Sequence, residues 1–221
     1  MAWIRSNKKG SGGSGEDYIY NVHTASFNTG HNHTANTKII FKACVYDQAS
    51  PSTYGQVFGA RNGNRNSNAF GFFHRFNNAR RYCFYRTTSE ALGDVVGTAS
   101  STSSPFTTTV CIFTATGNTL SWYPENNPSD VHSITAAGTV DGGIAPLALF
   151  CCNNATTANG WNIGDFGAMR LYWFEIYESD VLEHRFVPAY NNDQYCLYDE
   201  ETQTYFYDQT SSGMYLMGQV S

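Results

Sequence analysis

The sequence predicts an all-β protein built from many short strands. Three observations carry this prediction: aromatic residues make up 15% of the 221-residue chain, charged residues only 14%, and glycine occurs 20 times. Long solvated helices need many Glu, Lys, Ala and Leu residues on their exposed faces, and this balance argues against them. The aromatic and β-branched content is sufficient for a real core, so disorder is not expected. The length favours a single domain of sandwich or barrel type.

Short apolar runs alternate with turn formers from Glu16 onward. We expect strands at 39–46, 57–60, 69–73, 81–85, 107–114, 119–123, 145–151, 167–177, 183–187, 194–199 and 204–207, and a short helix or turn only at 89–96. Asn and Gly separate these runs and tolerate the positive φ angles of tight turns. The run 167–177 is apolar on both alternating faces, as in a strand buried on both sides. Pro188 is expected to end its strand, because proline cannot donate to a ladder.

Residues 1–15 form a separate unit ahead of the domain, which we place at 16–221. An apolar tip, Trp3 and Ile4, is followed by Arg5, two lysines and a Gly/Ser run that behaves as flexible coil. Two interpretations stay open: a disordered tail or linker, and a peptide that anchors the chain to another protein through Trp3, Ile4 and Arg5. The segment has no apolar core region, so we do not expect a secretory signal. Membrane insertion is not expected either, because no run of about 18 apolar residues exists.

Charge and cysteine usage exclude further classes of protein. The formal net charge of −5 disfavours non-specific nucleic-acid binding, which needs a basic face. A chain of this length can bury a core without disulfide staples. Cys44 and Cys111 lie in strand-like runs, where a thiol behaves as a small apolar side chain. We therefore expect the six cysteines to be reduced, buried and structural.

The C-terminal third carries the most specific pattern. It reads MRLYWFEIY at 169–177 and LEHRFVPA at 182–189, followed by LYD at 197–199, TYFY at 204–207 and SSG at 211–213. This pattern resembles a concanavalin A-like (laminin-G-like) jelly-roll domain common in bacteriophage and gut bacterial surface proteins. Residues 37–46 and 56–61 are similar to early strands of that family. The resemblance covers about residues 18–215 and departs at Cys196, where the family usually has Gly.

The resemblance implies an architecture and a function. The architecture is an antiparallel two-sheet jelly-roll sandwich behind a flexible N-terminal peptide. The function is that of a bacteriophage virion surface protein, a fibre, spike or receptor-binding module that binds host-surface or mucosal carbohydrate. The alternative is a purely structural capsid or tail decoration protein. We expect assembly in the bacterial host cytoplasm, contacts with other virion proteins through residues 1–15, and homo-oligomers that supply avidity.

Sugar binding needs rings that stack on pyranose faces, and amides or carboxylates that hydrogen-bond hydroxyls. Two groups of residues offer these at strand ends or in loops: Trp122, Tyr123, Glu125 and Asn126, and then Trp161 and Asn162 in the loop 153–164. We expect them to contact a ligand. The alternative, that both tryptophans cap the hydrophobic core, stays open.

Catalysis is not expected. Residues 178–183 match the E-x-D-x-x-E run of laminarinase-type glycoside hydrolases, which share the jelly-roll fold. Here the run falls where the resemblance places a hairpin turn. Glu178, Ser179 and Asp180 would then be solvated turn residues, and a motif with free positions matches often by chance.

No metal or cofactor is assigned. His31 and His33 are interpreted as part of a polar loop, because a histidine pair alone lacks the ligand count of a metal site. Calcium is the better metal hypothesis, with oxygen donors from Asp141, Asn153, Asn154 and Asp165. The arginines between 61 and 86 alternate with aromatic residues, and we expect the rings to be buried and the arginines to face solvent or a partner.

Overall fold

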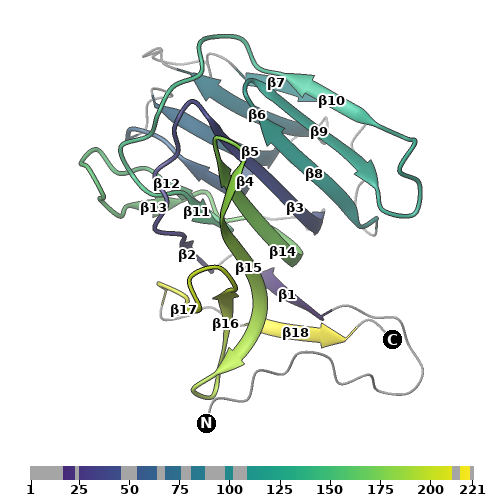
Figure 1. Ribbon diagram of the computed structural model, residues 1–221, viewed down its shortest axis with the longest axis vertical. Coiled ribbons are helices and arrows are strands. Elements are labelled where there is room, and N and C mark those ends of the chain that lie inside the picture. The colour runs from purple at the N-terminus through teal and green to yellow at the C-terminus, as the bar shows by residue number, and fades with distance from the viewer. Residues whose placement is uncertain are drawn as a thin grey trace.

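The computed structural model describes residues 17–22, 25–45, 54–63, 68–75, 81–87, 98–101, 109–210 and 215–219. Within these ranges every regular element is a strand, and the strands form two sheets in which antiparallel pairing prevails (Figure 1). The all-β prediction is therefore confirmed. The expected anchor at 1–15 and the helix or turn at 89–96 lie outside the described residues.

No helix in the described part of the chain is long and apolar enough to cross a membrane.

The first sheet has ten strands. Its order is β10 (His132–Thr135), β9 (Thr119–Pro124), β8 (Cys111–Thr116), β3 (Thr37–Val45), β14 (Ala168–Glu178), β15 (Val181–Asn191), β16 (Gln194–Asp199) and β17 (Thr204–Phe206). Beside β14 lies β1 (Asp17–Val22), which also pairs with β18 (Tyr215–Gln219). A strand near the start of the chain is thus enclosed by C-terminal strands.

The second sheet has eight strands. Its order is β13 (Ile163–Gly164), β12 (Cys152–Asn153), β4 (Tyr54–Ala60), β5 (Ala69–Arg75), β6 (Arg81–Thr87) and β7 (Thr98–Ser101), while β11 (Ala148–Leu149) joins β4 to β2 (Phe27–Asn28). The expected long strand at 145–151 is reduced to these two residues of β11. Phe150 breaks it, because this residue adopts a positive φ of 65° that a strand cannot continue.

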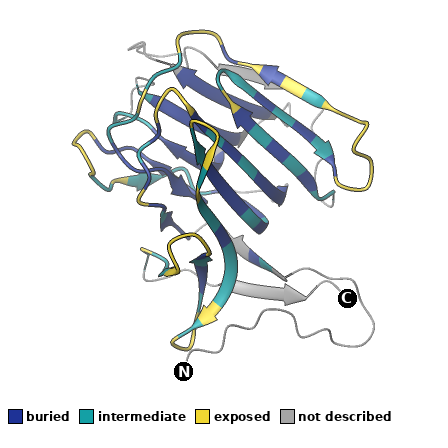
Figure 2. Cartoon of the chain, in the orientation of Figure 1, coloured by how far each residue is buried: buried dark blue, intermediate teal, exposed yellow. Residues whose placement is uncertain are grey.

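A shared aromatic core holds the two sheets together. Phe41 of the first sheet lies 5.9 Å from Phe58 and 6.1 Å from Phe72 of the second, measured between ring centroids. Phe41 also stacks on Phe113 at 4.7 Å. Figure 2 shows the strands of both layers mostly buried, with the exposed residues concentrated in the connecting turns. The high aromatic content of the sequence thus fills the core between the two sheets, which has little room for charged side chains.

Strand β15 changes partner along its length. It pairs with β14 from Val181 to Phe186 and with β16 from Phe186 to Asn191. Pro188 therefore lies inside β15, paired with Leu197, and the prediction that it ends the strand is wrong. At Pro188 the ladder with β14 has already ended, so the missing proline N–H costs no hydrogen bond on that side.

Two other expectations about burial have different outcomes. All six cysteines are buried thiols, as predicted. Phe72, Phe73 and Tyr82 are buried as expected, but Arg86 is 0% exposed rather than solvated. Its guanidinium lies 3.9 Å from the ring centroid of Phe70 and donates to the carbonyl of Thr34 at 2.6 Å.

Candidate functional site

Trp122 does not belong to an exposed sugar-contact surface. It is 1% exposed, lies edge-on to Tyr82 at 5.3 Å and stacks on His132 at 5.6 Å. The prediction that Trp122 contacts a ligand is wrong, and the alternative of a core-capping ring is correct. Strand alternation explains this placement, because Leu120 is buried on the same face two residues earlier.

The other three residues of the first group remain accessible. Tyr123 is half-buried on the opposite face of β9, and Glu125 and Asn126 are exposed in the following loop. Glu125 forms an ion pair with Lys42 at 2.5 Å, so one of its carboxylate oxygens already has a partner.

The second group lies in a loop that is braced from within. Asn153 is buried, and its amide makes four hydrogen bonds: it donates to the carbonyls of Pro146 and Gly160, and it accepts from the backbone N–H groups of Ala155 and Asn162. Trp161 is half-buried and Asn162 is exposed. This loop and the β9–β10 loop lie on opposite sides of the molecule in Figure 1, so the two predicted groups do not form one site.

The calcium hypothesis is not supported by the placement of its oxygen donors. Arg61 donates to Asn154 Oδ1 at 2.5 Å and to Asp165 Oδ2 at 2.7 Å, so a guanidinium already occupies the position between these two oxygens. The Asn153 amide is used inside the loop. Asp141 lies elsewhere, close enough to Arg86 for its pKa to be influenced by that charge.

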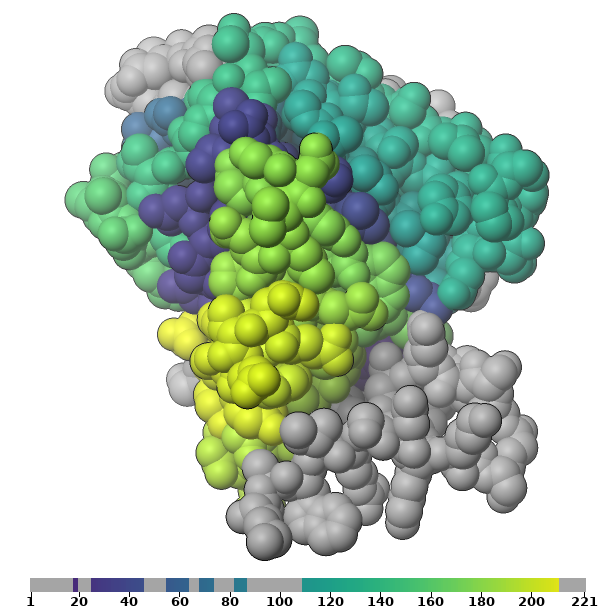
Figure 3. All heavy atoms as spheres, in the orientation of Figure 1, coloured from purple at the N-terminus to yellow at the C-terminus, as the bar shows by residue number. Residues whose placement is uncertain are grey.

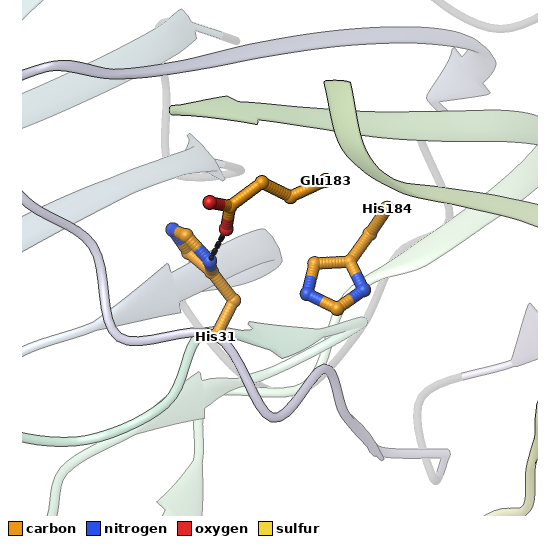
Figure 4. A group of neighbouring side chains, drawn as sticks. All are labelled: His31, Glu183 and His184. Carbon is orange, nitrogen blue, oxygen red and sulfur yellow. Dashed lines mark ion pairs between the residues drawn. The ribbon is translucent and has the colours of Figure 1, made fainter. Parts of the chain in front are cut away.

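A cluster of acidic and imidazole side chains lies where the β2–β3 loop meets the β14–β15 hairpin. Figure 4 shows His31, Glu183 and His184 pointing toward one another. His31 Nδ1 lies 3.2 Å from Glu183 Oε2, and the two imidazole centroids are 5.8 Å apart. Figure 3 shows the two segments side by side on the surface of this face. Loop and hairpin are also joined by the hydrogen bond from Thr34 Oγ1 to Glu178 Oε1, across 144 residues of sequence.

His31 is enclosed by carboxylates. Its side chain is 8% exposed, and its Nε2 lies 3.4 Å from Thr37 Oγ1 and 3.7 Å from Glu178 Oε2. Burial lowers the pKa of His31, and the negative charges of Glu183 and Glu178 oppose this effect only in part. The buried imidazole is therefore favoured in its neutral form.

His184 is held by a second carboxylate. Its Nδ1 lies 2.8 Å from Oδ2 of Asp199, which is 0% exposed. Asp199 also accepts hydrogen bonds from the backbone N–H of Arg185 and from the Thr202 hydroxyl. Burial raises the pKa of Asp199, but the hydrogen bonds from His184, Thr202 and Arg185 outweigh it and bring the pKa below its ordinary value. Asp199 is thus an ionised acceptor that orients the imidazole of His184.

This cluster revises two expectations. Ser179 and Asp180 form the exposed turn, as predicted. Glu178, however, is the last residue of β14, partly buried and hydrogen-bonded to Thr34 and Thr37, so the prediction that it is a solvated turn residue is wrong. His31 and His33 do lie in a loop, but both are buried. Sequence spacing carries no signal for the cluster, because His31 is distant along the chain from Glu183 and His184.

Comparison of the sequence with protein-family models gave no match, and a comparison with curated proteins gave none either.

Proposed function

We propose that this chain is a carbohydrate-binding module displayed on the surface of a bacteriophage virion, with Trp161 and Asn162 as its main sugar contacts. The two-sheet sandwich is in this proposal a concanavalin A-like jelly roll, which the pattern at 169–213 supports. The proposal assigns the chain no catalytic role.

The observation that carries the sugar proposal is the braced loop 153–164. Each of the two N–H donors of the Asn153 amide is used, and its oxygen accepts twice. The chain is therefore fixed on both sides of Trp161 before any ligand arrives. A half-buried ring beside an exposed amide, Asn162, offers a stacking face and hydrogen-bonding groups together. Preorganisation of this kind reduces the entropy lost on binding.

The β9–β10 loop is a weaker second contact region. Tyr123 and Asn126 remain available there, whereas Trp122 is buried and Glu125 is paired with Lys42. Because this loop lies on the other side of the molecule, one small glycan does not reach both regions (Figure 1).

Display on a virion is supported by the family resemblance and by the low charge of the chain. In this proposal residues 1–15 dock on another virion protein, and homo-oligomers raise the avidity of weak single sites. Antibody labelling of phage particles in electron micrographs tests the location.

A glycan array tests the sugar proposal. We expect the full chain to bind a subset of host-surface or mucosal glycans, and Trp161→Ala or Asn162→Ala to reduce that binding. Tyr190→Ala is the matched control, because this ring is exposed on β15, far from the loop in chain order. A folded wild type that binds no glycan, or equal loss in all three variants, contradicts the proposal. The first of these outcomes favours a structural decoration protein.

A further inference from the structure

We propose that His31, Glu183 and His184 bind one divalent transition-metal ion of the zinc class. Each residue offers one ligand atom, and these atoms lie within 4.8 Å of one another. His31 Nδ1 and Glu183 Oε2 are 3.2 Å apart. Two ligands of one tetrahedral zinc, at bonds of about 2.0–2.1 Å, are separated by about 3.3 Å. This pair already has the spacing of two ligands of one ion.

A β-bulge brings two consecutive residues to the same site. Neighbours in a regular strand point to opposite faces of the sheet. The ladder between β14 and β15 pairs Ile176 with His184 and Tyr177 with Leu182, so Glu183 is the inserted residue. Bulges re-aim side chains in this way. Glu183 and His184 therefore both reach His31, as Figure 4 shows.

His184 presents a free lone pair to the site. Its Nδ1 is 2.8 Å from Asp199, whose two carboxylate oxygens also accept from the Arg185 N–H and the Thr202 hydroxyl, so Nδ1 is the donor of this pair. In this tautomer the lone pair is on Nε2, the nitrogen that faces His31 and Glu183 in Figure 4. A carboxylate that fixes the tautomer of an imidazole in this way is typical of the outer shell of zinc sites.

The hydrogen bonds of Thr37 favour one tautomer of His31. The Thr37 hydroxyl donates its single proton to Glu178 Oε2 at 2.7 Å and accepts from the N–H of Thr34 at 2.7 Å. Toward His31 Nε2, at 3.4 Å, this hydroxyl is left as an acceptor, which favours the tautomer with the hydrogen on Nε2. In this tautomer the lone pair of His31 is on Nδ1, the atom 3.2 Å from Glu183 Oε2.

Two imidazole nitrogens and a carboxylate oxygen thus lie within reach of one ion. In these tautomers the three atoms present lone pairs to one another, and a shared cation turns their repulsion into coordination. Nitrogen donors favour zinc-class ions, whereas calcium and magnesium prefer oxygen-only sets. Three protein ligands leave a fourth position for solvent. The side chain of Glu183 is 44% exposed, which gives the ion a path to the site.

Zinc titration of the full chain, first stripped with a chelator, tests the proposal by calorimetry. We expect one Zn²⁺ per chain. Glu183→Gln and His184→Gln should each weaken the affinity at least about tenfold, and Asp199→Asn, which removes the orienting carboxylate, by about 10- to 100-fold. Glu125→Gln is the matched control, since Glu125 has similar exposure, 49%, and one cationic partner. It should bind zinc like the wild type. Co²⁺, whose visible spectrum reports nitrogen and oxygen ligands, provides a second readout.

Two results would overturn the proposal. The first is a folded wild type that takes up no zinc, which would mean that a proton rather than a metal lies between His31 and Glu183. The second is zinc uptake that Glu183→Gln and His184→Gln leave unchanged, which would place the ion elsewhere on the chain. Circular dichroism of each variant separates lost binding from lost folding. Glu183→Gln is the decisive variant, because its partly exposed side chain is replaced by one of nearly the same shape.

Discussion

Replacement of Asn153 by alanine should weaken both the fold and the proposed sugar loop. The substitution removes four hydrogen bonds. Those to the Pro146 carbonyl and from the Ala155 N–H are buried, and we assign them about 1.5 kcal/mol each. Those that involve Gly160 and Asn162 are partly buried and can be replaced by water, so about 0.5 kcal/mol each applies. The expected loss of unfolding free energy is about 4 kcal/mol.

Urea unfolding followed by tryptophan fluorescence measures this loss directly. For a chain of this size, the same loss lowers the midpoint of thermal unfolding by roughly 8–16 °C. Asn162→Ala is the control: it deletes the same amide from an exposed position in the same loop, and it should change stability by no more than about 0.5 kcal/mol. A loss below about 1 kcal/mol for Asn153→Ala would refute the reasoning that this amide braces the loop.

Two further predictions concern charge and backbone packing. Burial raises the pKa of Asp141 to about 6, and the positive charge of Arg86 only partly opposes it. The folded state therefore retains a proton that the unfolded state has lost, so this group's contribution to stability declines as the pH rises from about 4 to 6. Asp141→Asn should reduce that decline by up to about 1 kcal/mol, a value that allows for solvent screening. The measurement is the unfolding free energy as a function of pH. An unchanged slope would contradict the raised pKa of Asp141. At Gly167, an added Cβ would lie 2.1 Å from the backbone oxygen of Gln56, so Gly167→Ala should cost about 3 kcal/mol. Gly117→Ala is the control: an added Cβ there meets no atom within 4 Å, and its φ of 52° should cost only about 1 kcal/mol of unfolding free energy. Equal losses of unfolding free energy at the two glycines would contradict the prediction for Gly167.

The sequence predicted most of the strands and none of the histidine–carboxylate cluster. Short apolar runs bounded by turn formers are local features, so the predicted bounds of β5, β9 and β14 lie close to the observed ones. Alternation of apolar and polar residues, applied strictly, would have placed Trp122 in the core, because it follows Leu120 by two residues. The prediction that Pro188 ends its strand is wrong because the rule against proline depends on how many neighbours a strand has, and at this position the ladder with β14 has ended.

By itself, then, the sequence determined that the chain folds into β-strands around an aromatic core with buried thiols, because composition and two-residue periodicity are read one segment at a time. Only the tertiary structure decided that His31 meets Glu183 and His184. That contact depends on a bulge at Glu183, on the pairing of β15 with β14, and on a buried Asp199 that sets the imidazole tautomer. The bulge and the hairpin pairing are backbone geometry that residue type does not specify, and the contact of His31 with the hairpin joins segments that are distant along the chain.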